Sequence, residues 1–175
     1  MIKELEEKIK KSGFKCRMCA ECCSGGNNEV MVSADEIDII EEKTGLKFNE
    51  IAEPYPEWID ADDDKRYTFG WVLKRGDDGN CIFLENKRCR IYDDRPNICR
   101  TYPFMIDNNN ELLTFECDGL NPNFICLDAK TIAQDLIKRK NDEDKEFKET
   151  EMQYQKHSIG KGSTVIDSRG LHKYP

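Results

Sequence analysis

Four cysteines fall within the short stretch CRMCAECC, and their spacing limits the chemistry that they can share. Cys16, Cys19 and Cys22 follow the C-x2-C-x2-C pattern that opens the ligand run of bacterial ferredoxins, where three thiolates converge on one iron–sulfur cluster. Cys23 follows directly, and neighbouring side chains diverge by about 100° on a helix and about 180° on a strand. The pattern therefore predicts two sites, the first begun by the three spaced cysteines and the second reached by Cys23.

The chain has nine cysteines in all, and their meaning depends on the compartment. The opening MIKELEEKIKK alternates charges and lacks the apolar region of a signal peptide, and no apolar run approaches the roughly 20 residues of a membrane span. These features predict a cytoplasmic protein without membrane insertion, in which clustered thiols are metal ligands rather than disulfides. Cys126, in FICLDA beside a long helical pattern, is expected to be a spare apolar side chain. The candidates that complete the two sites are Cys81, Cys89, Cys99 and Cys117.

Sites made only of thiolates suit zinc or iron–sulfur clusters. Structural zinc typically uses paired C-x2-C knuckles, and only the beginning of this chain has such a pair. The ferredoxin-like spacing therefore favours two [4Fe–4S] clusters, with zinc as the alternative. Both histidines, His157 and His172, lie near the end of the chain, and no serine, histidine and acid arrangement stands out. We expect no catalytic residues, and a redox or accessory protein rather than an enzyme.

The low content of large apolar residues suggests that such metal centres would stabilise the fold. Leu, Ile, Val and Phe make up roughly a fifth of the 175 residues, so the apolar core is expected to be thin and a metal staple would stabilise it. The net charge is -8, and no cluster of Lys or Arg is dense enough to follow a phosphate backbone. Nucleic acid is therefore excluded as an expected partner.

Local patterns predict several elements of an α+β fold, a small irregular metal-stapled domain with short helices and a small antiparallel sheet. Apolar residues at helical spacing predict a helix over 2–12, which Gly13 ends. Ser33 and Glu36 have the spacing of a capping box at the start of a helix that ends at Gly45. Pro96 favours the start of another helix, which Pro103 stops.

The strands and the C-terminal part are predicted from similar signals. Residues 67–74 and 81–84 are expected to pair as a hairpin around RGDDGN, and LLTFEC is expected to form a later strand. A helical pattern runs from about 128 to 156, and residues 157–175 have little to pack. The chain is therefore divided into a cysteine-cluster metal-binding domain, 1–127, and a C-terminal helix with a polar tail, 128–175. Residues 141–175 are the expected docking arm for a larger protein or enzyme complex.

The segments FKCRMCAECC, SADEIDIIEEKTG, GNCIFLENKRCRIYDDRPNICRTYPF and CDGL, in that order, resemble the YkgJ-type cysteine-cluster (CxxCxxCC) family, which is described as zinc- or iron-chelating. The resemblance runs from about residue 14 to 120. It implies that Cys117 matches a later family cysteine that precedes a glycine, although Asp118 stands where proline is common; Cys126 has no counterpart. The shared metal ligands that it implies are Cys16, Cys19, Cys22, Cys23, Cys81, Cys89 and Cys99.

Three functions compete at this point. The first is an iron–sulfur protein that transfers electrons, or regulates in response to redox state or oxygen, while bound to a larger enzyme complex. The second is a zinc-stapled interaction module, and the third is a metal or cluster delivery factor. Arg95 and Arg100 flank Cys99, and a guanidinium there could donate hydrogen bonds to cluster sulfurs. We expect Arg95 to pair instead with an acid such as Asp93 or Asp94, and Arg100 is undecided between the two roles.

Overall fold

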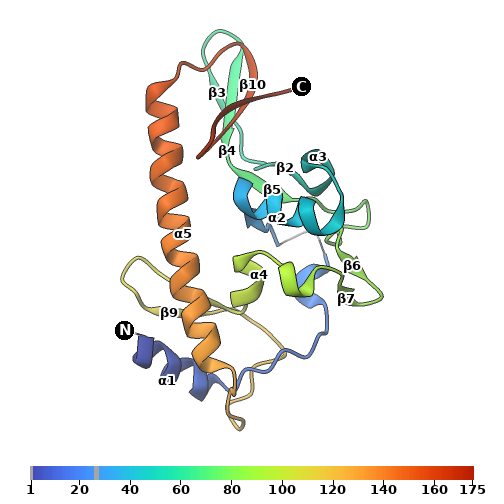
Figure 1. Ribbon diagram of the computed structural model, residues 1–175, viewed down its shortest axis with the longest axis vertical. Helices are drawn as coiled ribbons and strands as arrows, with labels where there is room; N and C mark the ends of the chain where they lie inside the picture. Colours follow the sequence, from blue (N-terminus) through green and yellow to red (C-terminus); the bar gives the residue numbers. More distant parts are fainter. Residues whose placement is uncertain (1, 26–27) are drawn as a thin grey trace.

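A single long helix, α5 (Ala129–Lys156), runs along one side of the molecule and touches elements at both of its ends (Figure 1). The computed structural model describes residues 2–25 and 28–175. The helices besides α5 are α1 (Ile2–Ser12), α2 (Ala34–Thr44), α3 (Phe48–Ile51) and α4 (Asn97–Thr101), with 3-10 helices η1 (Glu21–Cys23) and η2 (Tyr92–Asp94). The strands are β1 (Met31–Val32), β2 (Ala52–Pro54), β3 (Ile59–Ala61), β4 (Lys65–Phe69), β5 (Trp71–Leu73), β6 (Leu84–Glu85), β7 (Arg88–Cys89), β8 (Phe104–Ile106), β9 (Leu112–Thr114), β10 (Gly162–Asp167) and β11 (Gly170–Tyr174).

The helix ends follow the local signals. The Ser33 hydroxyl accepts a hydrogen bond from the Glu36 amide at 3.2 Å, and the Glu36 carboxylate accepts one from the Ser33 amide at 3.0 Å, so the capping box of α2 is confirmed. Gly45 ends α2 and Gly13 follows α1, both with left-handed backbones. The predicted helix after Pro96 is α4. The long C-terminal helix is α5, and the α+β class is confirmed.

The prediction of one strand over 67–74 is wrong, because Gly70 divides the segment. Its φ of +75° turns the chain, so β4 enters a four-stranded sheet of order β11-β10-β4-β3 and β5 enters a three-stranded sheet of order β1-β5-β2. The Gly70 amide donates to the Ile166 carbonyl at 2.9 Å, which fixes this turn against the C-terminal strands. A side chain at this position would be strained by the left-handed backbone.

The predicted strand at 81–84 is also wrong. Only Cys81 bridges the preceding segment, opposite Arg75, and residues 82 and 83 turn away. The hairpin that forms instead is β6–β7, in which Glu85 pairs with Arg88 across a two-residue loop. Both loop residues, Asn86 and Lys87, have positive φ, as a type I′ turn requires. The later strand at LLTFEC is present as the shorter β9, which pairs with β8.

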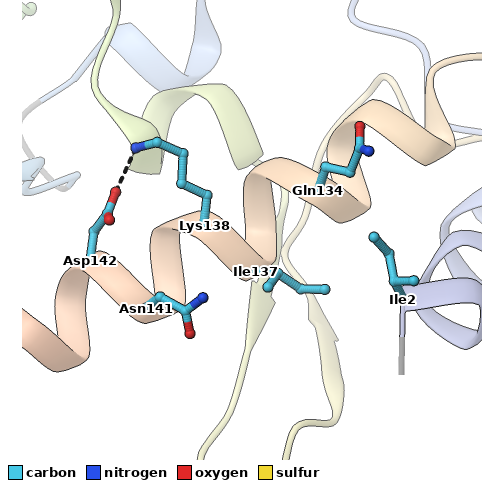
Figure 2. A pocket seen from close by; sticks show the side chains of 6 residues that line it. All are labelled: Ile2, Gln134, Ile137, Lys138, Asn141 and Asp142. Atoms are coloured by element: carbon cyan, nitrogen blue, oxygen red, sulfur yellow. Dashed lines mark hydrogen bonds and ion pairs between the residues drawn. The ribbon is translucent and has the colours of Figure 1, made fainter.

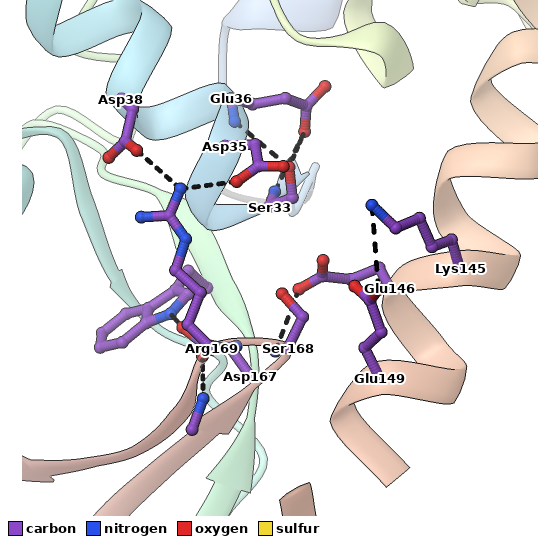
Figure 3. A network of polar contacts seen from close by, with 12 residues as sticks. Ser33, Asp35, Glu36, Asp38, Lys145, Glu146, Glu149, Asp167, Ser168 and Arg169 are labelled. Carbon is purple, nitrogen blue, oxygen red and sulfur yellow. Dashed lines mark hydrogen bonds and ion pairs between the residues drawn. The ribbon is translucent and has the colours of Figure 1, made fainter. Parts of the chain in front are cut away.

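The prediction that residues 157–175 have little to pack is wrong. They form the hairpin β10–β11, and β10 pairs in parallel with β4, the one parallel pairing among the sheets described. Val165 and Ile166 are fully buried. Polar contacts secure the hairpin: the Arg169 guanidinium lies 2.6 Å from both Asp35 and Asp38 of α2 (Figure 3). The domain boundary at residue 127 stays a prediction.

Two apolar cores result, one on each side of α4. The first lies between α2, α3 and the three-stranded sheet and includes Val165 from β10. The second lies between α1, β8 and the first half of α5. Cys81 and Cys89 pack against the first core, and Phe14 and Leu120 pack against the second. The cysteine-bearing segments therefore contact both cores, and α5 contacts elements of both cores as well. Over the described residues, no helix has both the length and the apolar character needed to cross a bilayer.

Candidate metal centre

The cysteine run is an irregular segment with unusual backbone geometry. Met18 and Ala20, which alternate with the cysteines, have left-handed backbones with φ of 51° and 68°. Such conformations cost about 1 kcal/mol or more for residues other than glycine, and they cluster at functional sites. No residue from 15 to 25 is buried, so apolar packing does not hold these residues in place. Its shape therefore indicates a role for the cysteines that it presents.

Backbone contacts bring the end of this run to the segment that carries Cys81. The Cys81 amide donates to the Cys23 carbonyl at 2.8 Å. The Arg75 guanidinium donates to the carbonyls of Gly25, Gly79 and Asn28, and so ties the two loops together. No local pattern signals this role of Arg75, because carbonyl acceptors depend on backbone geometry rather than on residue type.

Cys89 and Cys99 reach the same region from regular elements. Cys89 lies on β7, and its position is set by the type I′ turn of the β6–β7 hairpin. Cys99 lies on α4, whose first amide, that of Asn97, donates to the Glu36 carboxylate at 2.8 Å. At its other end, the Thr101 hydroxyl accepts a hydrogen bond from Arg139 of α5 at 3.0 Å. Helices α2 and α5 thus hold α4 from both sides.

We call Cys23, Cys81, Cys89 and Cys99 the inner thiol group, because each is half-buried and they act on one another electrostatically. Burial and then the charges of neighbouring thiolates raise the pKa of Cys99 to about 12. Burial likewise raises the pKa of Cys81 and of Cys89. Metal binding here must therefore release protons at neutral pH, as thiolate ligation requires.

The outer thiol group comprises Cys16, Cys19 and Cys117. Burial raises the pKa of Cys117, and the charges of Cys19 and Cys16 add to this effect. Two hydrogen bonds bring the segments together. The Lys15 amide donates to the Gly119 carbonyl at 3.0 Å, and the Arg17 guanidinium donates to the Asp118 carbonyl at 3.2 Å.

Cys22 lies between the two groups. Its Sγ is 3.8 Å from the Sγ of Cys23, and a hydrogen bond between them lowers the pKa of Cys22 to about 7 and raises that of Cys23. Its charge also raises the pKa of Cys99 in the inner group and of Cys117 in the outer group. The expectation that the side chains of Cys22 and Cys23 diverge is wrong, because the 3-10 helix η1 brings the two sulfurs into contact.

The ninth cysteine and a shallow surface hollow lie elsewhere. Cys126 is buried in the second core, beside Ala129 at the start of α5. A shallow hollow of about 370 Å³ between α1 and α5 is lined by Ile2 and by α5 residues such as Gln134 and Ile137, with no thiol among them (Figure 2). The thiol groups and this hollow are therefore separate features of the surface.

The donor set fits a thiolate-bound metal centre. Seven thiols form two groups with Cys22 between them, and Arg95, whose charge offsets part of the rise that burial causes in the pKa of Cys89, has a buried Nε without a hydrogen-bond partner. Within residues 2–25 and 28–175, no three His, Cys, Asp or Glu side chains converge closely enough to hold a single ion. Binding of a metal by these thiols would therefore require their side chains to rotate, and the eight cysteines stay the predicted ligands.

Gly119 offers a test of the outer group. A Cβ at this position would lie 2.7 Å from the Lys15 carbonyl oxygen and 3.0 Å from the Phe14 ring, so Gly119→Ala must push the two segments apart. We expect this variant to lose about half of the bound metal, because Cys117 moves away from Cys16 and Cys19. Metal analysis of the purified variant checks this. Gly76→Ala is the matched control, since its nearest neighbour is the flexible carboxylate of Asp78. Full metal content in Gly119→Ala would contradict this placement of Cys117.

Comparison with known proteins places the cysteines in a family. The chain is 28% identical over 107 residues to "Uncharacterized protein MJ0661" of Methanocaldococcus jannaschii; the match covers 60% of this chain and about half, 52%, of that relative. No solved structure matches the chain. Residues 15–118, which include the inner and outer groups and Cys22, match the family CxxCxxCC, described as "Putative zinc- or iron-chelating domain". The chain therefore belongs to the CxxCxxCC family of zinc- or iron-chelating domains.

Proposed function

We propose that the protein is an iron–sulfur protein with two [4Fe–4S] clusters, which acts in electron transfer or in redox- or oxygen-responsive regulation. One cluster would be held by the inner thiol group and the other by Cys16, Cys19, Cys22 and Cys117. The observation that supports this proposal is the contact of the two groups at the Cys22–Cys23 pair, with sulfurs 3.8 Å apart. Clusters so placed would supply one-electron transfer over a short path when bound. The residues themselves bind, shield and tune the clusters.

Zinc is the second candidate, and the distance between the Cys22 and Cys23 sulfurs is compatible with it. Two thiolates on a tetrahedral zinc with bonds of about 2.3 Å lie about 3.8 Å apart, which matches the separation of the two adjacent sulfurs. A zinc centre would stabilise the fold and carry no redox chemistry. The C-x2-C-x2-C spacing and the number of thiols support the iron–sulfur proposal more strongly.

One preparation distinguishes the two candidates. Protein purified without air is analysed for iron, inorganic sulfide and zinc, and its visible spectrum is recorded. We expect about eight iron and eight sulfide per chain with sulfur-to-iron charge-transfer absorption. About two zinc per colourless chain would instead support the structural module.

We also propose that α5 docks the protein on its partner. The outward face of the second half of α5 exposes Phe147 and Met152, whose exposed fractions are 70% and 59%, among charged residues. Deletion of residues 141–175 is an unsuitable test, because it would remove the buried side chains of Val165 and Ile166. Point substitutions leave both cores intact.

The docking proposal predicts that Phe147→Ser with Met152→Ser abolishes co-purification of a larger complex from the native cells. Metal content and thermal stability should stay close to wild type, since both side chains are exposed. The matched control is Phe124→Ser with Leu127→Ser, which removes two exposed apolar side chains elsewhere. The proposal would be contradicted if Phe124→Ser with Leu127→Ser lost the complex while Phe147→Ser with Met152→Ser kept it. The docking surface would then lie outside α5.

A further inference from the structure

Arg95 is held rigidly beside the inner thiol group. Its guanidinium carbon lies 3.7 Å from the centroid of the Tyr92 ring, and its Nη1 donates to the Tyr92 carbonyl at 2.9 Å. Arg100 braces the same turn, because its Nε donates to the Arg95 carbonyl at 2.9 Å and its Nη2 to the Asp93 carbonyl. Stacking and hydrogen bonding together fix the plane of the Arg95 guanidinium, and hence the direction of its Nε–H.

The Nε–H of the same guanidinium is buried and left without an acceptor. Among the side chains that the structure describes, the Arg95 Nε is the one buried nitrogen or oxygen atom with no hydrogen-bond partner. A buried donor without an acceptor is destabilising, and native proteins rarely contain one unless a ligand or ordered water supplies the acceptor. The guanidinium of Arg75, by contrast, donates to three carbonyls.

The surroundings of Arg95 identify the missing acceptor by its chemistry. Hydrogen bonding to Cys23 and the positive charge of Arg95 lower the pKa of Cys22, and the same charge offsets part of the rise that burial causes in the pKa of Cys89 and Cys99. The expected pairing of Arg95 with a nearby acid is not seen, since its Nη1 donates to the Tyr92 carbonyl and its charge acts on the thiols, whereas Arg100, whose role the sequence leaves undecided, donates to backbone carbonyls. Metal-bound sulfur is a hydrogen-bond acceptor, and donors to it stabilise the more negative state of the centre.

We propose that the Arg95 Nε–H donates a hydrogen bond to a metal-bound sulfur of the inner thiol group, and that Arg95 thereby sets the affinity and the reduction potential of that centre. The proposal rests on the proposed function in that it requires metal at the inner group. It does not depend on which metal is bound, because a cysteine thiolate on zinc and a sulfur of an iron–sulfur cluster both accept such a bond. Arg95 is a positioning and tuning residue rather than a ligand.

The experiment compares wild type, Arg95→Lys, Arg95→Gln and Arg88→Gln as full-length chains purified without air. Arg88→Gln is the matched control, because it removes the same charge from an exposed side chain next to Cys89. Metal affinity is measured by chelator competition, and the potential of the iron–sulfur form by redox titration. Both Arg95 variants should bind the inner metal 10–100-fold more weakly, as the loss of such supporting contacts typically does. Their potential should also be lower than that of wild type.

The outcomes separate the hydrogen bond from simple charge. Arg95→Lys keeps the charge but lacks the fixed Nε–H, so wild-type affinity and potential in this variant would overturn the proposal. Equal losses in Arg88→Gln and Arg95→Gln would also overturn it. If Arg95→Gln does not fold, Tyr92→Leu, which removes only the ring under the guanidinium, should show a smaller loss of affinity, and no loss would count against the proposal. Wild-type protein without any metal would overturn the proposed function itself, a result that is distinct from the others.

Discussion

Replacement of Cys22 by serine is expected to leave less than half of the metal of the wild-type protein, a larger loss than any other single cysteine substitution produces. Cys22 contacts Cys23 at 3.8 Å, and its charge acts on thiols of both the inner and the outer group. Its removal takes a ligand from one centre and disturbs the other. Cys99→Ser and Cys117→Ser each affect one group, and each should leave about half of the metal.

Metal analysis of these variants, purified side by side without air, checks the prediction. Cys126→Ser is the matched control, because Cys126 is buried in the apolar core around α1 and α5 and should leave the metal content unchanged. If the metal contents of Cys22→Ser and Cys117→Ser are equal, Cys22 serves only one of the two centres. Full metal in Cys22→Ser would remove it from the ligand set and contradict the arrangement of two adjoining sites.

The elements that the sequence predicts well are those specified by neighbouring residues. The capping box of Ser33 and Glu36 begins α2, and Pro96 precedes α4. In each case the signal is a side chain that satisfies or lacks a backbone hydrogen bond within a few positions. Helix α5 is predicted because its apolar residues recur at helical spacing along its first half.

The strand pairings escape prediction because they depend on residues far apart in the chain. Arg66 and Ser163 face each other in the parallel pair β4–β10, although they are 97 positions apart. The glycine-containing tail looks polar in isolation, and only this pairing explains the burial of Val165 and Ile166. The predicted strand over 67–74 runs through Gly70, whose left-handed backbone directs β4 and β5 into different sheets.

In the candidate site, too, features set by neighbouring residues are predicted from the sequence, and features set by distant contacts are not. The run from Cys16 to Cys23 is visible in the sequence because its spacing is local. The distribution of the later cysteines over an inner and an outer group required the β6–β7 turn and the contact of Gly119 with Lys15. Which ligands belong to which metal stays a prediction. Arg95 and Arg100 have the same chemistry and flank the same cysteine, so only the backbone around them could separate their roles.

Removal of metal is expected to unfold residues 15–25 locally while both apolar cores remain folded. Side chains 15–19 are exposed, Met18 and Ala20 have left-handed backbones, and few backbone hydrogen bonds tie this segment to the rest of the chain. Without metal–sulfur bonds, chain entropy of about 1–2 kcal/mol per residue outweighs these contacts. Helix α5 and strand β10 keep their buried apolar side chains in the metal-free protein. The amides of 15–25 should therefore lose their protection from hydrogen exchange, and those of α5 and β10 should keep it.

Hydrogen exchange monitored by mass spectrometry can compare metal-loaded protein with protein refolded in the presence of a chelator and a reductant. Readdition of the metal found in the native preparation, after the chelator is removed, is the control and should restore protection in residues 15–25. Unchanged protection in the metal-free protein would mean that packing alone holds the cysteine run, against the exposure seen there. Loss of protection throughout α5 would mean that the apolar cores unfold when the metal is removed. The contribution of the metal to folding would then approach the roughly 10–16 kcal/mol found for structural zinc.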